Sequence, residues 1–464
     1  MHWTVAKLIE ATGGRLIRGN PDRPVGGIST DTRAIRAGDC FVALRGERHD
    51  AHDYISGALE GGAGAIVFNA SRPDAAASLP EGVAAVEVAD TLFALGELAR
   101  YHRRRHFIPV VGITGSNGKT STKEMVAGIL SVRRNVLKNK GNFNNLIGVP
   151  LTLLGLEPQH EAAVVEMGIN VPGEMERLVE IAGPTAGLIT NIHPAHLEGL
   201  GSLDGILAEK GKLWAGLGED GLAAVNLDDE RLAAFAEGVA ARTVRYSLKN
   251  PGADVRLAGK VDTVEGASVF QMILGDEVVS VRLPVMGIHQ VQNALAASAL
   301  AWGMGEDPAT IVEGLAGCAA VKQRMQTHRL KGDRVLVDDT YNANPGSVIA
   351  AVRTVLSAGG GKPCIAVLGE MRELGPDSAS IHRELGREIV KLGVSRLIAV
   401  GELGREIVEG AREAGLPFDA GCHVPTHEAA VERLRESWIE GAWVLVKGSR
   451  AMAMERIVEG ILAK

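Results

Sequence analysis

A short apolar strand, a glycine-rich turn and a helix follow one another between residues 108 and 130. The turn reads Gly115-Ser116-Asn117-Gly118-Lys119-Thr120, and apolar residues recur at helical spacing after it. Backbone N–H groups at such a turn and the positive end of the helix bind phosphate oxygens. A strand that runs directly into a phosphate-binding helix belongs to a parallel sheet covered by helices, so this feature predicts an α/β fold.

The same turn indicates which cofactors the chain uses. Lys119 can reach the β- and γ-phosphates of a nucleotide, and the Thr120 hydroxyl can ligate Mg²⁺. We therefore predict ATP and Mg²⁺ as cofactors, with Ser121 completing the ATP-binding turn. The usual spacing of such loops places a glycine where this chain has Ile113, so the loop is a variant. The alternative is a glycine turn that binds nothing.

Changes in the pattern of predicted strands and helices divide the chain into three predicted domains. A length of 464 residues also favours three domains, at roughly 150 residues each. Residues 1–105 contain short strands and helices and form a small N-terminal α/β domain, whose basic run 103–105 we expect to be the exposed end of a helix. Residues 106–322 form a central ATP-binding domain with a mostly parallel sheet, and their period-two segment at 254–286 predicts appended antiparallel strands. Residues 323–464 form a second α/β unit that resembles a dinucleotide-binding fold but lacks Gly-x-Gly-x-x-Gly after its first strand.

Charge and composition exclude several classes of protein. The net charge of −7 argues against nucleic-acid binding, which requires a basic surface. No run of 18 apolar residues is present, so we expect no membrane span. The four cysteines are far apart and form no Cys-x-x-Cys pair, which argues against a disulfide framework and a zinc ribbon. The start of the chain lacks the apolar core of a signal peptide, and we expect a cytoplasmic protein.

Polar residues follow several predicted strands at their carboxyl ends, where ligands gather in open α/β sheets. Glu166 follows one strand and is a candidate Mg²⁺ ligand, although it could instead cap a helix. His193 and His196 follow another strand, but Mg²⁺ seldom takes imidazole, so a packed or solvent-facing histidine is an open alternative. Lys210, considered alone, is a surface lysine.

The last predicted domain contributes a second polar segment. Asp338-Asp339 and the two asparagines Asn342 and Asn344 follow its first strand, where they either recognise a polar ligand or form a capped turn. The segment Lys447-Gly448-Ser449-Arg450 follows its final strand. This segment could bind an anion at a helix start, or Arg450 could be a surface cation.

Taken together and in order, these motifs are highly specific, and the sequence resembles the Mur ligase family over essentially its whole length. The segments that carry the resemblance are 29–33, 41–46, the phosphate loop, 142–150, 166–168, 195–198, 287–295, 338–345 and 446–450. The histidine–asparagine pair usual in the family is His289-Gln290 here, which leaves the role of Gln290 open.

The resemblance implies roles for individual residues. Thr120, Glu166 and His196 would contact Mg²⁺, and Lys210 would correspond to the family's carbamylated lysine. Asn293 would contact adenine, while Arg324 and Asp339 would contact the phosphates and ribose of ATP. Lys119, Lys210, His196 and Arg324 would be the catalytic residues. The residues implied to bind the other substrates are Ser29, Thr30, Asp31 and Arg33 for the UDP-sugar end, Asn144 and Asn145, and Asn342, Asn344, Lys447, Ser449 and Arg450 for the peptides.

The implied reaction is the ATP-dependent addition of D-alanyl-D-alanine to UDP-N-acetylmuramoyl-tripeptide through an acyl phosphate, because Tyr341-Asn342-Ala343-Asn344-Pro345 and Gly369 to Gly375 match that branch of the family. We expect a monomer, with the last domain closing over ATP. Two alternatives compete with this hypothesis: a related amide ligase such as a folylpolyglutamate synthase, and a nucleotide-binding switch that hydrolyses ATP without an acceptor amine.

Overall fold

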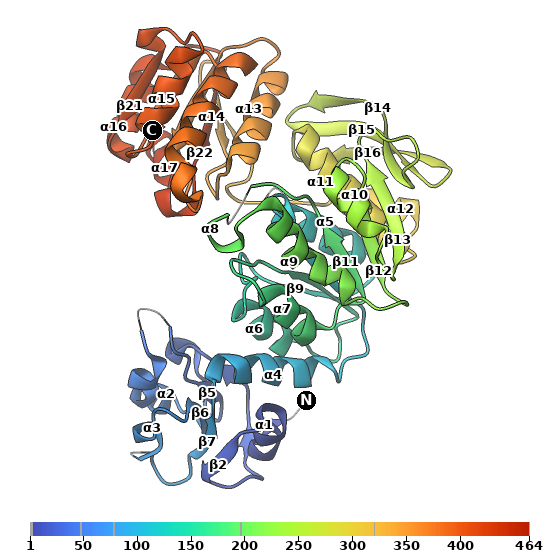
Figure 1. Ribbon diagram of the computed structural model, residues 1–464, viewed down its shortest axis with the longest axis vertical. Helices are drawn as coiled ribbons and strands as arrows, with labels where there is room; N and C mark the ends of the chain where they lie inside the picture. Colours follow the sequence, from blue (N-terminus) through green and yellow to red (C-terminus); the bar gives the residue numbers. More distant parts are fainter. Residues whose placement is uncertain (1–2, 47–48, 78, 195–196, 320, 464) are drawn as a thin grey trace. The chain divides into compact units, whose positions relative to one another are not determined.

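The computed structural model describes residues 3–46, 49–77, 79–194, 197–319 and 321–463 of the chain (Figure 1). These residues form two compact units. The first contains residues 1–112, 134–169 and 173–186, and the second contains residues 113–133, 170–172 and 187–464. No helix in the described ranges is long and apolar enough to cross a membrane.

The N-terminal part of the first unit is a five-stranded sheet with helices on both faces. Its strand order is β2-β7-β6-β5-β4, and only the β2–β7 pair is antiparallel. The strands are β2 (Arg15–Arg18), β4 (Ile28–Ser29), β5 (Cys40–Val42), β6 (Ala65–Asn69) and β7 (Ala84–Val88), and a separate pair joins β1 (Trp3–Thr4) to β3 (Pro24–Val25). The helices are α1 (Val5–Thr12), α2 (Ile55–Glu60), α3 (Asp74–Ala77) and α4 (Thr91–Arg103).

Alternation along the strands explains the two covered faces. Cys40 and Val42 join a core with residues of α1 and α4, whereas Phe41 and Ala43 join a second core with residues of α2. Successive side chains of a strand point to opposite faces of the sheet, so a continuous apolar run fills both cores. The predicted α/β character of this region is confirmed.

The rest of the first unit lies between residues 103 and 186 and carries one correction. It contains β9 (Val136–Lys138), α6 (Gly148–Leu154), β10 (Ala162–Glu166) and α7 (Glu174–Ala182), with β9 and β10 parallel. We expected the basic run 103–105 to be a solvated helix end, but Arg103 is buried. Its guanidinium donates to the carbonyl oxygens of Ala182, the last residue of α7, and of His106 and Ile108, and these hydrogen bonds compensate the buried charge.

The sheet of the second unit contains strands in the order β16-β15-β14-β13-β12. Within the second unit, β12 (Leu222–Asn226), β13 (Arg242–Ser247) and the start of β14 (Val255–Val264) pair in parallel. The predicted antiparallel addition is confirmed, because β14, β15 (Ala267–Leu274) and β16 (Glu277–Leu283) pair antiparallel. The remaining elements here are β8 (Val110–Thr114), α5 (Lys119–Ser131), β11 (Ala186–Ile189), α8 (Leu197–Leu200), α9 (Leu203–Ala215), α10 (Glu230–Ala236), α11 (Ile288–Gly303) and α12 (Pro308–Ala316).

Residues 326–462 form a six-stranded sheet of order β17-β18-β22-β19-β20-β21, parallel except for β17. Val335 and Val337 belong to one core and Leu336 to the other, so helices cover both faces. The elements are β17 (Gln326–Arg329), β18 (Val335–Asp338), α13 (Pro345–Gly359), β19 (Cys364–Gly369), α14 (Ser378–Leu392), β20 (Arg396–Val400), α15 (Gly404–Glu413), β21 (Gly421–Val424), α16 (His427–Ser437), β22 (Trp443–Lys447) and α17 (Glu455–Leu462).

Candidate active site

The predicted phosphate loop connects β8 to α5 in the second unit, and its two glycines are required by geometry. Gly115 has a φ of +140°, and a Cβ there would lie 1.9 Å from Thr190 Oγ1. Gly118 has a φ of +82°, and a Cβ there would lie 2.4 Å from Asn293 Oδ1. Any other residue would be strained and would collide with its neighbours. The loop therefore keeps its tight path only with glycine at both positions.

Residues 190–193, which follow β11, hold the phosphate loop by hydrogen bonds. The Asn117 N–H donates to Asn191 Oδ1 at 2.9 Å, and the Asn117 carbonyl accepts from Thr190 Oγ1 at 2.5 Å and Asn191 Nδ2 at 3.2 Å. Ser116 Oγ donates to the His193 carbonyl at 2.8 Å. We did not predict roles for Thr190 and Asn191, although both stand in the strand-end segment in which we considered histidines. His196, the predicted ligand of that segment, lies outside the described residues.

Lys119 and Thr120 occupy the start of α5, where a phosphate would meet the positive helix end. Lys119 Nζ donates to the carbonyl oxygen of Gly115 at 2.7 Å, so the cation lies over the loop. Thr120 is buried, and its Oγ1 accepts a hydrogen bond from an Arg324 guanidinium nitrogen at 3.1 Å. The Arg324 guanidinium also lies 4.2 Å from the centre of the Tyr341 ring. Arg324, which precedes β17, thus reaches the residue that ends the phosphate loop, and its contact with ATP stays a prediction.

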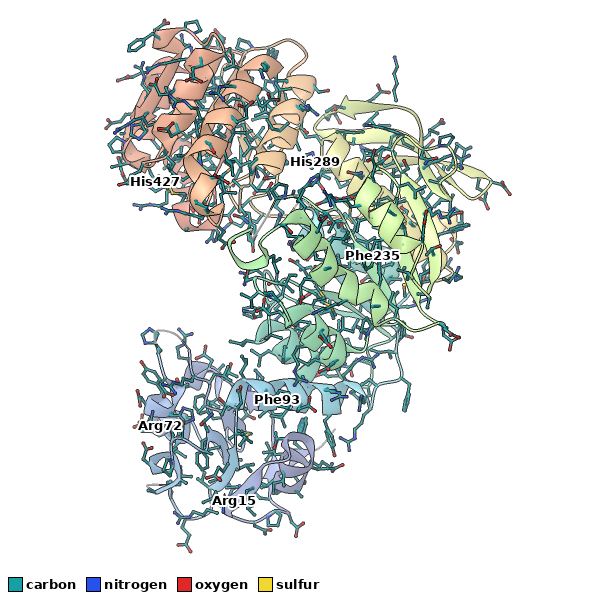
Figure 2. All side chains as sticks on the ribbon, viewed as in Figure 1. Arg15, Arg72, Phe93, Phe235, His289 and His427 are labelled. Carbon is teal, nitrogen blue, oxygen red and sulfur yellow. The ribbon has the colours of Figure 1, made fainter. Side chains whose placement is uncertain are left out.

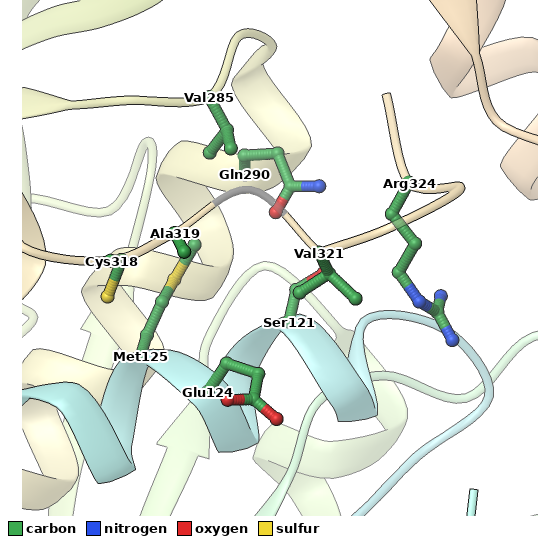
Figure 3. A pocket seen from close by; sticks show the side chains of 9 residues that line it. All are labelled: Ser121, Glu124, Met125, Val285, Gln290, Cys318, Ala319, Val321 and Arg324. Carbon is green, nitrogen blue, oxygen red and sulfur yellow. The ribbon is translucent and has the colours of Figure 1, made fainter. Parts of the chain in front are cut away.

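A small pocket borders the first turns of α5 in the second unit (Figure 3). Figure 3 shows Ser121, Glu124 and Met125 on α5, opposite Val285 and Gln290, with Arg324 at one side. The remaining lining residues are Cys318, Ala319 and Val321. Gln290 is buried, and its Oε1 accepts from Asn293 Nδ2 at 3.1 Å. The pocket therefore combines apolar walls with the Gln290 amide, which Asn293 orients, and with the charged side chains of Glu124 and Arg324.

Lys210 on α9 is buried, which corrects its first interpretation as a surface lysine. Burial lowers the pKa of the Lys210 amine well below its ordinary value, and the positive charge of Lys119 lowers this pKa further. The negative charge of Glu209 opposes the shift in part. A lysine in such a place favours its neutral, nucleophilic form.

Residues at the carboxyl ends of β18 and β22 come together because these strands are parallel neighbours. Asp339 Oδ2 pairs with Lys447 Nζ at 2.6 Å, and Lys447 Nζ also donates to the Asn342 carbonyl at 2.8 Å. The Arg450 N–H donates to Asn342 Oδ1 at 3.3 Å. Ser449 is buried, and its hydroxyl has no hydrogen-bond partner among the described residues. Of the predicted peptide-facing residues, Asn342, Lys447 and Arg450 thus form one polar cluster with Asp339.

The central and last predicted domains also meet near His289, which Figure 2 labels. His289 Nδ1 lies 3.3 Å from Thr354 Oγ1 on α13. A Cβ at Gly287 would lie 2.6 Å from the same Thr354 oxygen. The chain therefore passes close to α13 just before α11 begins.

In the first unit, two predicted site residues contact each other. Glu166 is buried at the end of β10, and its Oε1 accepts from Asn144 Nδ2 at 2.8 Å. Asn145 Oδ1 accepts from the N–H groups of Ile147 and Gly148, so it holds the turn that leads into α6. The carboxylate of Glu166 is therefore oriented by a neighbouring amide, and its proposed contact with Mg²⁺ stays a prediction.

The remaining predicted residues of the first unit lie together after β4. Ser29 Oγ donates to the Asp31 carbonyl at 3.0 Å, and Thr30 lies between them. Asp31 pairs with Arg33 at 2.7 Å, and the hydrogen bond from Arg33 lowers the pKa of Asp31 to about 2. Both side chains are well exposed, with 88% of the Arg33 side chain accessible. The segment therefore presents an oriented ion pair to solvent.

Comparisons with known proteins give one consistent result. The chain matches the models described as "Mur ligase family, catalytic domain" at residues 24–103, "Mur ligase middle domain" at 113–301 and "Mur ligase, glutamate ligase domain" at 323–450. It is 38% identical to the UDP-N-acetylmuramoyl-tripeptide–D-alanyl-D-alanine ligase of Escherichia coli K12, covering 99% of this chain and 98% of that protein. The enzyme of the same name from Bacillus subtilis 168 is 34% identical, again over 99% and 98%.

Solved structures agree with the sequence relatives. A crystal structure of MurF from Acinetobacter baumannii superposes with a TM-score of 0.90 at 33% identity, covering 100% of this chain and 99% of that one. MurF from Thermotoga maritima in complex with ADP has a TM-score of 0.82 at 28% identity, covering 94% and 96%. A folylpolyglutamate synthase of Mycobacterium tuberculosis shares the fold alone, with a TM-score of 0.62 at 16% identity.

Proposed function

The chain belongs to the Mur ligase family, and we propose that its catalytic site is built from the phosphate loop and the last domain. The chain is an ATP-dependent, Mg²⁺-using ligase that joins D-alanyl-D-alanine to UDP-N-acetylmuramoyl-tripeptide in peptidoglycan precursor synthesis. The observation that carries the proposed site is the hydrogen bond from Arg324 to Thr120 Oγ1. It brings a cation from residues 323–464 to the loop on which phosphates bind.

The reaction activates a carboxylate that is otherwise a poor electrophile. An oxygen of the tripeptide carboxylate bonds to the γ-phosphorus of ATP, and ADP leaves. The amine of D-alanyl-D-alanine then bonds to the acyl carbon, loses a proton, and phosphate leaves. Lys119 and Arg324 would stabilise charge on the transferring phosphoryl group. The Thr120 hydroxyl is a hard oxygen donor, which suits Mg²⁺, and the bound ion would neutralise charge on the phosphates.

The nucleotide base belongs, in this proposal, in the pocket of Figure 3. The pocket is lined by Ser121, which follows the phosphate loop, and by Gln290, which receives a hydrogen bond from Asn293. Apolar walls and the Gln290 amide, which Asn293 orients, suit adenine, whose ring is flat and whose edge donates and accepts hydrogen bonds. Asp339 would contact the ribose, because Met325 N–H and Lys447 already orient its carboxylate.

Lys210 would act as a carbamate. Its neutral amine can add to CO₂ and lose a proton, which turns a buried cation into an anion. The charge of Lys119 that disfavours protonated Lys210 would stabilise this carbamate. The anion would then help to position the cation at the phosphates.

The three predicted domains receive separate roles. Residues 1–105 would hold the UDP-sugar end through Ser29, Thr30, Asp31 and Arg33. Residues 106–322 would bind ATP, and residues 323–464 would bind the peptides through Asn342, Lys447, Ser449 and Arg450. We also propose a monomeric enzyme in the cytoplasm, which light scattering of the purified protein would test for its oligomeric state.

A ligation assay tests the proposed site. Wild-type protein, ATP, Mg²⁺, D-alanyl-D-alanine and UDP-N-acetylmuramoyl-tripeptide should give the pentapeptide by mass spectrometry, with lysine and diaminopimelate tripeptides compared side by side. Lys119→Ala should lower kcat on the order of 10²-fold or more, because a cation at the reacting phosphate is lost. Lys249→Ala removes an exposed lysine of the same unit and should match wild type. Wild-type ligation by Lys119→Ala, or phosphate release with folate and glutamate alone, would overturn the proposal.

A further inference from the structure

Asn344 begins α13 and uses both ends of its side-chain amide. Its Oδ1 accepts from the Ser347 N–H at 2.9 Å, and its own N–H donates to Ser347 Oγ at 3.0 Å, which makes a reciprocal cap. Its Nδ2 donates to Asn117 Oδ1 in the phosphate loop at 2.6 Å. The amide that we predicted to face a peptide substrate is thus already shared between a helix start and the loop.

Asn117 is well placed to receive this hydrogen bond. Its backbone N–H and carbonyl are both held by the Thr190–Asn191 segment, so the main chain of the loop has a defined position at this residue. The side chain is the part that reaches across to α13. A Cβ at Gly346 would lie 3.9 Å from Asn117 Nδ2, so the first turn of α13 packs close to the loop without a clash.

The segment that precedes α13 joins the same loop to the predicted amine site. The Arg324 guanidinium lies over the Tyr341 ring and donates a hydrogen bond to Thr120 Oγ1. Asn342 receives hydrogen bonds from Lys447 Nζ and from the Arg450 N–H. Residues 341–344 are therefore linked to the phosphate loop at two points and to the strand-end cluster at two more.

We infer that Asn344 is a positioning residue that fixes the amine-binding segment 341–344 against the phosphate loop. This inference rests on the proposed function, because it assigns the second substrate to the strand-end cluster. The hydrogen bond to Asn117 ties the formation of the amine site to the loop that carries the nucleotide. Loss of this hydrogen bond leaves nucleotide binding intact but lets the segment move. The amine then attacks the acyl phosphate more slowly, and more of the acyl phosphate is hydrolysed by water.

Asn344→Ser is the informative variant, because serine keeps the helix cap but is too short to reach Asn117. The expected result is a 3- to 10-fold rise in KM for D-alanyl-D-alanine, as for one neutral hydrogen bond. More than one ATP should be consumed per pentapeptide formed, while the KM for ATP stays near the wild-type value. Ser347→Ala removes one partner of the cap and leaves the Asn117 contact, so it should lower the melting temperature without changing the ratio of ATP to product.

A double-mutant cycle with Asn117→Ala separates positioning from a general structural effect. If the two side chains act through their hydrogen bond, the double variant should have the same kcat/KM for D-alanyl-D-alanine as the less active of the two single variants. The inference would be overturned if the loss of kcat/KM in the double variant were the product of the two single losses. It would also be overturned by an Asn344→Ser enzyme with wild-type KM and an ATP-to-product ratio of one. Failure of the wild-type enzyme to make the pentapeptide would instead overturn the proposed function, so the two failures are distinguishable.

Discussion

Lys210 is buried near Lys119, and both burial and the charge of Lys119 destabilise the protonated form of the Lys210 amine. Its pKa in the folded protein lies well below 10.5, because of burial first and the charge of Lys119 second. Between the lowered pKa and the ordinary value, the unfolded chain binds a proton that the folded chain does not. In CO₂-free buffer the free energy of unfolding should therefore rise with pH through this window, by up to about 1.4 kcal/mol per pH unit from this group.

Lys210→Met removes the titrating amine and keeps the apolar stem, so its free energy of unfolding should rise less steeply with pH than that of the wild type. Urea unfolding at several values between pH 7 and 9.5 measures the difference. Parallel curves for the two proteins would contradict the lowered pKa. Adding bicarbonate should raise the free energy of unfolding of the wild type without reducing its slope, if the neutral amine becomes a carbamate, because the amine and bicarbonate give carbamate and water with no net proton change.

Single residues also show where prediction from sequence stopped. Lys119 and Thr120 were predictable because the order strand, glycine turn and helix defines their surroundings locally. Asn191 contacts Asn117 across 74 positions of sequence, and nothing in its own neighbourhood indicates this contact. Lys210 and Arg103 were both first assigned to the surface, since a charged residue on a helix says nothing about what packs over it until the fold is known.

At the scale of elements, the turn between β8 and α5 depends on glycine for two separate reasons, strain and space. Gly115→Ala would meet Thr190 Oγ1 at 1.9 Å and its backbone nitrogen at 2.9 Å, so the loop must shift. We expect at least a 10-fold loss of ATP affinity by isothermal titration, from strain of about 1–3 kcal/mol. Gly218→Ala is the matched control, because Gly218 also has a positive φ of +69° but no atom within 4 Å of the added Cβ. That variant should lose about 1–2 kcal/mol of stability and keep its ATP affinity.

Most strands were predictable as elements, because apolar runs such as that at 335–337 fill cores on both faces of a sheet. The very short strands β1, β3 and β4 were not, since two residues carry no periodic pattern and depend on their partners. The antiparallel extension at 255–283 was visible as alternation, because one polar and one apolar face repeat every second residue. The candidate site followed the same division: its strand-end residues were named from the sequence and their roles stay predictions, whereas Thr190 and Asn191, which hold the phosphate loop, were not named.

At the scale of the whole molecule, the proposed roles of the domains predict which ligands protect which parts of the chain. A non-hydrolysable ATP analogue with Mg²⁺ should slow amide hydrogen exchange in the phosphate loop, in 190–193 and in 324–344, because these segments share the contacts of Arg324, Asn191 and Asn344. The sheet of residues 15–88 should exchange as before. At 100 times the dissociation constant, the analogue should stabilise the unit that it binds by about 2.7 kcal/mol.

UDP-N-acetylmuramoyl-tripeptide added alone should give the complementary pattern, with protection at residues 29–33 and 41–46. Exchange measured by mass spectrometry on peptides from each region separates the two ligands in one experiment. Lys119→Ala is the control, since it should abolish protection by the nucleotide and keep protection by the UDP-sugar. Nucleotide-induced protection of residues 29–46 in the absence of the UDP-sugar would contradict the assignment of residues 1–105 to that substrate, because it would place a nucleotide contact outside the loop and the last domain.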